Sequence, residues 1–313
     1  MPRLSKSRRT LDALVEAAGF RSDVVGVESL AIGWPGKGGY RDDDGTHARA
    51  HLGQHGSVIF REYGTTLAMP ARFRVKEAAV FEHLAAAGLP VPSILAATDG
   101  IADFAGPPAM LLSDAGGEPL EELDRRGAFS DPALWRAVGA ALRQLHDVPL
   151  TGREPFAHRD FARAWMDFAP YFGRTIAQLR KRHPALDSPF RELNRLLREQ
   201  VADHLATRPR TICCGHIGGF PGLMLEPDEG GWATVGWLGL GYYVSIGDPD
   251  RDVVAIAARH QLRTGRDIPG AFYTGYGRRP DHVAAVVYDA YQRLRVHPDQ
   301  VADVVERLRV VLP

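Results

Sequence analysis

The chain has 313 residues, 45% of them hydrophobic, and a formal net charge of zero. This size and composition are typical of a globular protein with one large domain or two small ones. A neutral chain lacks the broad positive field that holds nucleic acid or an anionic membrane surface. We therefore expect neither a nucleic-acid partner nor a membrane partner.

Targeting signals and a disulfide scaffold are also excluded by the sequence. Residues 3–9 are basic, but no apolar run follows them as in a secretory signal, and no stretch is long enough to span a bilayer. The two cysteines, Cys213 and Cys214, are adjacent in the chain. Adjacent cysteines cannot staple a fold and fit a reducing compartment, so we expect a cytoplasmic protein.

The first third of the chain alternates predicted strands with two helices. Apolar spacing predicts a helix over 7–20, and residues 71–88 form a stronger helical pattern that stops at Gly88. Extended or strand-like patterns cover 24–33, 57–64, 89–100 and 107–117. The polar, glycine-rich stretch 34–56 is interpreted as a long hairpin loop.

From about residue 119 the pattern is largely helical. Residues 131–148 predict a helix with Asp131 as its N-cap, and further helices are predicted over 158–183, 187–206, 250–264, 280–295 and 298–311. Short strand-like runs cover 212–214, 222–226 and 232–238. The order predicts a two-lobed α+β fold, with an N-lobe at 1–112, a hinge at 113–118 and a helical C-lobe at 119–313.

Six motifs in one order resemble the aminoglycoside phosphotransferase and choline kinase family, which has a protein-kinase-like fold. They are a strand with a basic residue (VIFR) before a helix with R-x-K-E, then LAAAGLPVPSIL, PPAMLLSDAGGEPL, ALRQLHDVPLTG, GDPDRD and GYGRRPDHVAAVVYDAYQRLR. The resemblance covers nearly the whole chain. It implies that the β-rich N-lobe is the nucleotide-side lobe.

The resemblance also assigns roles to individual residues. Arg61 would bind the α- and β-phosphates and be held by Glu77, although an ordinary salt bridge between a strand and a helix would look the same. Ser113, in the hinge, would contact a nucleotide or ligand. Apart from the resemblance, Trp237, Tyr242 and Tyr243 follow Cys214 and His216 in the chain and could line an apolar pocket for a ligand.

The catalytic loop expected from the resemblance, over 211–252, is degenerate. The family's motif is H-G-D-x-x-x-x-N, followed by a strand with a second, metal-binding aspartate. The replacements here are Cys214 for the His, His216 for the Asp, Pro221 or Gly222 for the Asn, and Gly239 or Leu240 for the second Asp. Losing a general base costs a factor of about 10²–10⁴, and losing the Mg²⁺ ligands also removes charge neutralisation. We expect no protein-held metal, little basis for ATP or Mg²⁺ binding, and absent or very slow phosphoryl transfer.

Other features in the chain carry less information about function. Asp248 and Asp252, in the acidic turn, are expected to brace the loop structurally. The triplet His158-Arg159-Asp160 mimics a protein-kinase signature but lacks the downstream Asn, so a surface or cap role is favoured. The glycine-rich stretch 33–40 could cover a phosphate, but such turns are common.

Three functional interpretations remain open. The first is a non-phosphorylating pseudokinase of bacterial secondary metabolism, in antibiotic biosynthesis or resistance, that holds a small molecule in the interlobe cleft or a pathway protein. The second is an enzyme repurposed to another reaction on a small natural product through His216 and Cys214. The third is an atypical active phosphotransferase that recruits Glu226, Asp228 or Asp248 for metal.

Overall fold

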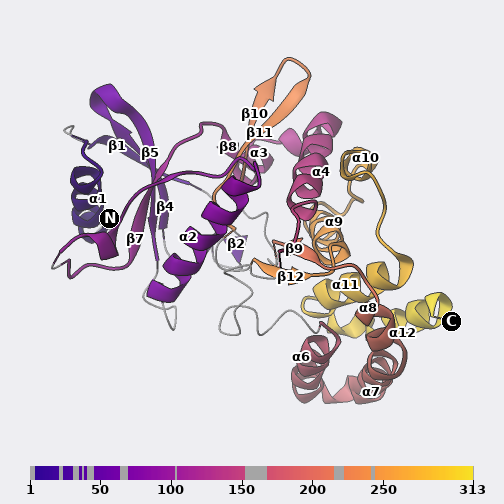
Figure 1. The fold of residues 1–313 in the computed structure, drawn as a ribbon. Coiled ribbons are helices and arrows are strands. Elements are labelled where there is room, and N and C mark those ends of the chain that lie inside the picture. Colours follow the sequence, from indigo (N-terminus) through magenta and orange to yellow (C-terminus); the bar gives the residue numbers. More distant parts are fainter. Residues whose placement is uncertain are drawn as a thin grey trace. The chain divides into compact units, whose positions relative to one another are not determined.

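The computed structural model describes residues 4–20, 24–30, 35–36, 39–40, 46–63, 70–102, 104–151, 168–214, 222–240 and 244–312. The chain forms two compact units (Figure 1), Met1–Asp131 with Phe220–Tyr242, and Pro132–Gly219 with Tyr243–Pro313. The predicted hinge at 113–118 lies inside the first unit, because a late hairpin completes that unit. The functional lobe boundaries remain a prediction.

The first unit is built on a five-stranded antiparallel sheet with the order β1-β4-β5-β7-β6. Its strands are β1 (Val24–Ser29), β4 (Thr46–Leu52), β5 (Gly56–Glu62), β6 (Ile94–Ala97) and β7 (Ala109–Ser113). A separate two-stranded ribbon pairs β2 (Pro35–Gly36) with β3 (Gly39–Tyr40). The expectation that 34–56 is one long loop is wrong, since β4 pairs with both β1 and β5.

Strand β4 was not predicted from the sequence because its buried face is made mostly of alanine. Ala48, Ala50 and Leu52 are buried and alternate with His47 and Arg49 on the opposite face. Alanine has a weak strand preference compared with β-branched and aromatic residues. The period-two alternation was nevertheless present in the sequence.

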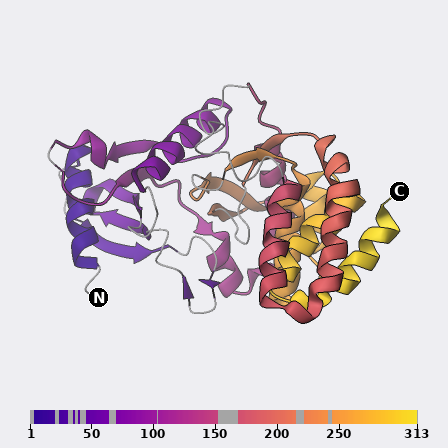
Figure 2. The ribbon, with the colours of Figure 1, turned by 90° about the horizontal axis from the view of Figure 1, so that it is seen from below.

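Two helices cover opposite faces of this sheet, as Figure 2 also shows. Helix α1 (Leu4–Ala17) buries Leu11, Leu14 and Val15 against the outer face, beside Ala48 and Phe60. Helix α2 (Pro70–Ala86) places Phe81 on the inner face. Gly88 follows α2 with φ of 81°, a conformation that suits glycine and ends the helix as predicted.

The late hairpin packs onto the inner face of the same sheet. It consists of β10 (Leu223–Asp228) and β11 (Gly231–Trp237), and β8 (Glu118–Pro119) adds a third strand. Met224 and Leu238 join one buried cluster with Ile59, Met110 and Leu112. Apolar side chains from three parts of the chain therefore cover one part of the inner face. The short helix α3 (Leu120–Arg125) follows β8.

The second unit is mainly helical. Its helices are α4 (Pro132–His146), α6 (Phe168–Arg182), α7 (Asp187–Leu196), α8 (Ala202–Ala206), α9 (Asp250–Thr264), α10 (Gly270–Tyr276), α11 (His282–Leu294) and α12 (Val301–Val311). A π-helical turn, Leu197–Val201, joins α7 to α8. Strands β9 (Thr211–Cys213) and β12 (Ser245–Gly247) pair antiparallel. None of the described helices is both long and apolar enough to cross a membrane.

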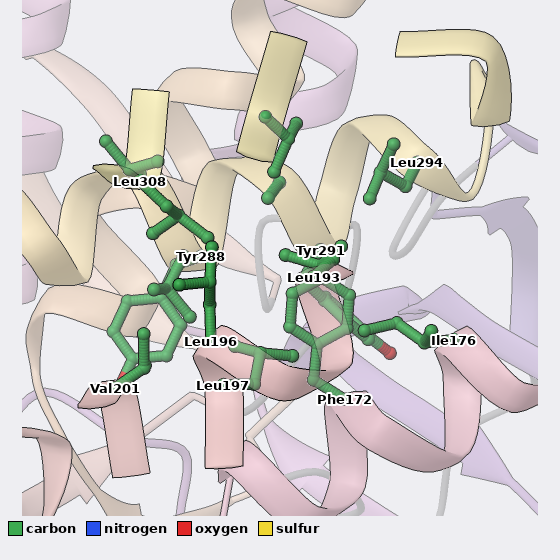
Figure 3. Packing of buried hydrophobic residues seen from close by; sticks show 14 of the residues in the cluster. Phe172, Ile176, Leu193, Leu196, Leu197, Val201, Tyr288, Tyr291, Leu294 and Leu308 are labelled. Atoms are coloured by element: carbon green, nitrogen blue, oxygen red, sulfur yellow. The ribbon is translucent and has the colours of Figure 1, made fainter. Parts of the chain in front are cut away.

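The core of the second unit forms where α6, α7, α11 and α12 pack together (Figure 3). Phe172 and Ile176 are one helical turn apart on α6 and fully buried, so they share a face. Tyr291 of α11 packs edge-on against Phe172, with ring centroids 5.4 Å apart. This apolar face explains why periodicity predicted these helices.

Helices α4 and α10 approach each other at two glycines. A Cβ atom built on Gly139 would lie 2.1 Å from the oxygen of Phe272, and one on Gly275 would lie 2.0 Å from the oxygen of Arg136. Both distances are far below van der Waals contact, so only glycine fits. This close backbone contact positions Tyr276, at the end of α10, beside the end of α4.

Candidate functional site

Several sequence motifs meet at the C-terminal end of α4. His146 places its Nε2 3.3 Å from Oδ2 of Asp252 and its Nδ1 2.8 Å from the hydroxyl of Tyr276. Thr211, at the start of β9, donates from Oγ1 to the main-chain oxygen of His146. The Leu-His helix end, the acidic turn and the Tyr276 segment are therefore one hydrogen-bonded group.

Asp252 uses its carboxylate to hold the main chain where the degenerate loop begins. The N–H of Cys214 donates to Oδ2 of Asp252 across 2.5 Å. Burial alone would raise the pKa of Asp252, but the bond from His146 and the charge of Arg251 lower it. The carboxylate is ionised and occupied by structural partners, as expected for a bracing residue.

The other aspartates of the acidic turn also have hydrogen-bond or ion-pair partners. Asp248 accepts from Arg208 Nε at 3.2 Å and from the Tyr288 hydroxyl at 3.1 Å. Asp250 is fully buried and pairs with Arg208 and, at 2.6 Å, with Arg278. Burial, the largest influence, raises the pKa of Asp248. These carboxylates stabilise the start of α9 and leave little capacity for a cation.

Among the described residues, one group could be considered for a metal ion. The ligand atoms of His146, Cys213 and Asp252 lie within 4.8 Å of one another and are buried. Each of the three already has a hydrogen-bond partner. His146 and Asp252 bond to each other, and Cys213 Sγ lies 3.5 Å from the main-chain oxygen of Asp248. Mg²⁺ prefers about six oxygen ligands, and this group offers one carboxylate. The residues present do not fit the Mg²⁺ of phosphoryl transfer.

Cys214 has the surroundings of a structural cysteine. Its side chain is buried, and burial together with the negative charge of Asp252 raises the pKa of its thiol well above the ordinary value. A nucleophilic cysteine needs the opposite shift, because the thiolate is the reactive form. His216, Tyr242, Tyr243 and the triplet 158–160 lie outside the described residues.

Arg61 is enclosed by side chains of its own unit. Its Nε lies 3.5 Å from Oε2 of Glu77, its Nη1 lies 3.2 Å from Nδ1 of His47, and its guanidinium lies 4.6 Å from the ring centre of Tyr63. The Tyr63 hydroxyl also donates to Glu77. We call these four residues the Arg61 cage. The predicted pairing of Arg61 with Glu77 is present, but within a closed cluster.

His47 is neutral in this cage. Burial, and secondarily the charge of Arg61, lower the pKa of His47 well below the ordinary value, while a contact with the backbone of Leu238 opposes them. A neutral imidazole offers a lone pair at Nδ1 that can accept from Arg61. Arg61 and Glu77 therefore neutralise each other's charge, and His47 and Tyr63 add polar contacts without adding charge.

The remaining predicted residues are spread over the first unit. Ser113 exchanges hydrogen bonds with Ser93, each at 2.8 Å, and so fastens β7 to the segment before β6. Trp237 is buried on β11 opposite Leu223. Glu226 and Asp228, proposed as alternative metal ligands, are exposed at the far end of β10.

The sequence model of the phosphotransferase enzyme family matches residues 48–297. The chain belongs to this family. The match covers most of both units, including Arg61, Glu77 and the acidic turn. No curated protein matches the chain.

Solved structures of phosphotransferases share the fold at low sequence identity. The ternary complex of streptomycin, ATP and APH(2″)-IIa is 11% identical with a TM-score of 0.56, over 96% of this chain and 97% of that one. The GDP complex of aminoglycoside 2′-phosphotransferase-IIIa is 17% identical with a TM-score of 0.58, over 96% and 92%. Ethanolamine kinase of Plasmodium vivax is 12% identical with a TM-score of 0.53, over 91% and 80%. The predicted α+β protein-kinase-like fold is confirmed.

Sequence reasoning missed three residues that shape the inner face in this family member. His47 and Tyr63 complete the Arg61 cage, and Arg49 bonds to the segment after β7. The signal for His47 and Arg49 was the alternation T-H-A-R-A-H-L, which places polar residues on one face of β4. For Tyr63, the signal was its place two residues after Arg61.

Proposed function

We propose that this phosphotransferase-family chain does not transfer phosphate and is a pseudokinase that binds a small molecule or a pathway protein in bacterial secondary metabolism. The observation that carries the proposal is that the hydrogen-bonding capacity of Asp252 and its neighbours is already used. The carboxylates retained in the acidic turn are bonded to Cys214, His146 and Arg208. By the family's motif, Gly239 or Leu240 takes the place of the metal-binding aspartate.

The closed Arg61 cage supports the same proposal. A phosphate-binding cation needs donors that a ligand can reach, and Arg61 is only 6% exposed. Its charge is already balanced by Glu77. Its guanidinium also faces His47 and Tyr63, which a phosphate would have to displace.

The ligand class follows by analogy with the structural relatives. Those structures are complexes with streptomycin and ATP or with GDP, so small hydroxylated amines and antibiotics are the first compounds to test on this chain. The repurposed-enzyme interpretation has lost support at Cys214, because burial raises the pKa of its thiol and the thiolate is the nucleophilic form. It now depends on His216 alone.

The decisive experiment measures phosphoryl transfer directly. The purified chain is incubated with ATP or GTP, Mg²⁺ and a panel of aminoglycosides, macrolides, choline and ethanolamine, and nucleoside diphosphate release is followed. We expect no release above background. Release that depends on an acceptor would refute the proposal and favour an active phosphotransferase.

A separate measurement tests the repurposed-enzyme interpretation. The chain and the variant His216→Ala are each incubated with the same panel without nucleotide, and products are followed by mass spectrometry. A new product formed by the natural chain and lost in H216A would favour that interpretation over a pseudokinase. No product with either protein would exclude it for these compounds.

A further inference from the structure

Three side chains with different donor atoms meet inside the second unit. They are His146 at the end of α4, Cys213 on β9 and Asp252 in the first turn of α9. One ring nitrogen, the thiol sulfur and one carboxylate oxygen all lie within 4.8 Å of one another, and all three residues are buried. We call these residues the His-Cys-Asp cluster.

The spacing of the cluster is close to that of a zinc site. Three atoms no more than 4.8 Å apart share a point within about 2.8 Å of each, and bonds to Zn²⁺ measure about 2.0–2.3 Å. Shifts of less than about one ångström therefore bring all three atoms to bonding distance. Nε2 of His146 and Oδ2 of Asp252 are already 3.3 Å apart, and two ligands of a tetrahedral zinc ion stand about 3.3 Å apart.

The hydrogen bonds that join the cluster are long. An N–H that donates to a charged carboxylate usually does so across about 2.7–2.9 Å, whereas the pair of His146 and Asp252 is 3.3 Å apart. Sγ of Cys213 lies 3.5 Å from the main-chain oxygen of Asp248 and 3.7 Å from that of Thr211, and a thiol is a weak donor. A metal ion that replaced these contacts would therefore displace little binding energy.

Neighbouring groups orient two of the ligands for a metal ion. Nδ1 of His146 is 2.8 Å from the hydroxyl of Tyr276. With a metal ion on Nε2, the ring proton resides on Nδ1 and is donated to that oxygen, as is usual for metal-binding histidines. Oδ2 of Asp252 accepts from the N–H of Cys214 and keeps a further lone pair for an ion.

The donor set favours a borderline-soft divalent cation. Nitrogen, sulfur and oxygen together are the ligands of Zn²⁺, whereas Mg²⁺ takes oxygen. A Cys213 thiolate and the Asp252 carboxylate carry two negative charges, which match those of the ion. Arg251 places its Nε 3.9 Å from Oδ1 of Asp252, and its positive charge opposes the ion. We therefore expect micromolar affinity rather than the tighter binding of many structural zinc sites.

We propose that His146, Cys213 and Asp252 form a Zn²⁺ site that ties the start of the degenerate loop to α4 and α9. On binding, a zinc–sulfur bond forms and the Cys213 thiol releases its proton to solvent, so no oxidant or reductant is needed. The main-chain oxygen of Asp248, 3.5 Å from Sγ, is a donor for the fourth position. The inference goes beyond the proposed function, because this ion would hold the fold together and take no part in phosphoryl transfer.

Cobalt is the probe that reports on the sulfur ligand. The full chain is purified without a polyhistidine tag, freed of metal with a chelator, and titrated first with Co²⁺ and then with Zn²⁺. We expect a single equivalent of Co²⁺ to produce a near-ultraviolet thiolate-to-cobalt charge-transfer band, which Zn²⁺ then removes by displacement. Zn²⁺ at about a hundredfold excess over its Kd should raise the melting temperature by about 5 °C or more.

Two cysteine variants distinguish the site from the thiol beside it. Cys213→Ser should abolish the band and weaken Zn²⁺ binding at least about tenfold, because even loss of an outer partner of a ligand costs about that much. Cys214→Ser is the matched control, since it changes the adjacent buried thiol and leaves the main-chain N–H that bonds to Asp252. It should keep the band and the Zn²⁺ affinity.

The natural chain alone can refute the inference, whatever the folding of the variants. No charge-transfer band at excess Co²⁺, or a band that Zn²⁺ does not displace, would overturn it, since binding by scattered surface histidines gives no such band. A band that survives in C213S, or that is lost in a folded C214S, would overturn it as well. These outcomes leave the proposed lack of phosphoryl transfer intact, because nucleotide turnover tests that proposal separately.

Discussion

Arg61 on β5 lies directly opposite His47 on β4, and its Nη1 is 3.2 Å from the Nδ1 of that imidazole. The two side chains share the inner face of the sheet with Glu77 and Tyr63. Because His47 is neutral, Glu77 supplies the negative charge that balances Arg61 in the cage. The stability of the first unit should therefore depend on that carboxylate.

Replacing Glu77 with Gln tests this dependence. The variant leaves the Arg61 charge buried with only neutral partners, and we expect the free energy of unfolding to fall by about 2–3 kcal/mol. Chemical denaturation monitored by circular dichroism measures the change. Glu122→Gln removes the same charge from an exposed pair with Arg125 and should cost less than about 0.5 kcal/mol; equal effects of the two variants would contradict the cage.

The Asp114 carboxylate predicts a specific dependence on pH. Its pKa in the folded state is lowered from the ordinary value of 3.8, so its contribution to stability is fully present above that value and is lost as the pH falls through the folded-state pKa. Thermal unfolding of the natural chain and Asp114→Asn should differ most at neutral pH. The difference should shrink below about pH 4; a gap that stays constant to pH 2 would show that the charge is not responsible.

The glycine contact between α4 and α10 predicts an asymmetric response to alanine. Gly275→Ala would place a methyl group 2.0 Å from the oxygen of Arg136, forcing the helices apart at a cost of about 1–3 kcal/mol. Gly270→Ala lies on the same helix with no atom within 4 Å of the new methyl group and should be neutral. Melting temperatures measure both, and similar values would contradict the close backbone contact.

The buried thiols predict slow alkylation of the folded chain. Burial is the main reason that the pKa values of Cys213 and Cys214 are raised, so little thiolate exists at neutral pH. Iodoacetamide should label neither residue until denaturant is added, as followed by intact mass. Rapid labelling of Cys214 in the native chain, absent in Cys214→Ser, would revive a nucleophilic role.

Elements with an uninterrupted apolar period were predictable from sequence. The helix predicted over 250–264 matches the bounds of α9 (Asp250–Thr264), and the pattern over 187–206 covers α7 to α8 without a break. Helix α10 was not predicted because it has only seven residues, three of them aromatic and two glycine. Its helical form depends on packing against α4, which no local pattern reveals.

The candidate site was predictable from sequence only where its residues lie close together along the chain. The bracing role expected of Asp252 follows from the acidic turn and agrees with its bonds, although its role in solution remains a prediction. The pairing of Arg49 with Asp114 spans 65 residues and depends on strand register, so the alternation around Arg49 could place it on one face of a strand but could not name its partner. The assignment of His216 to the place of the family's catalytic aspartate stays a prediction.

The bond from Cys214 to Asp252 is made by the main-chain N–H and does not involve the thiol. Every amino acid except proline carries that N–H. The loop therefore keeps this anchor with any residue other than proline at position 214. Substitutions at such a position can therefore change its reactive group without removing the contact that holds the start of the loop to α9.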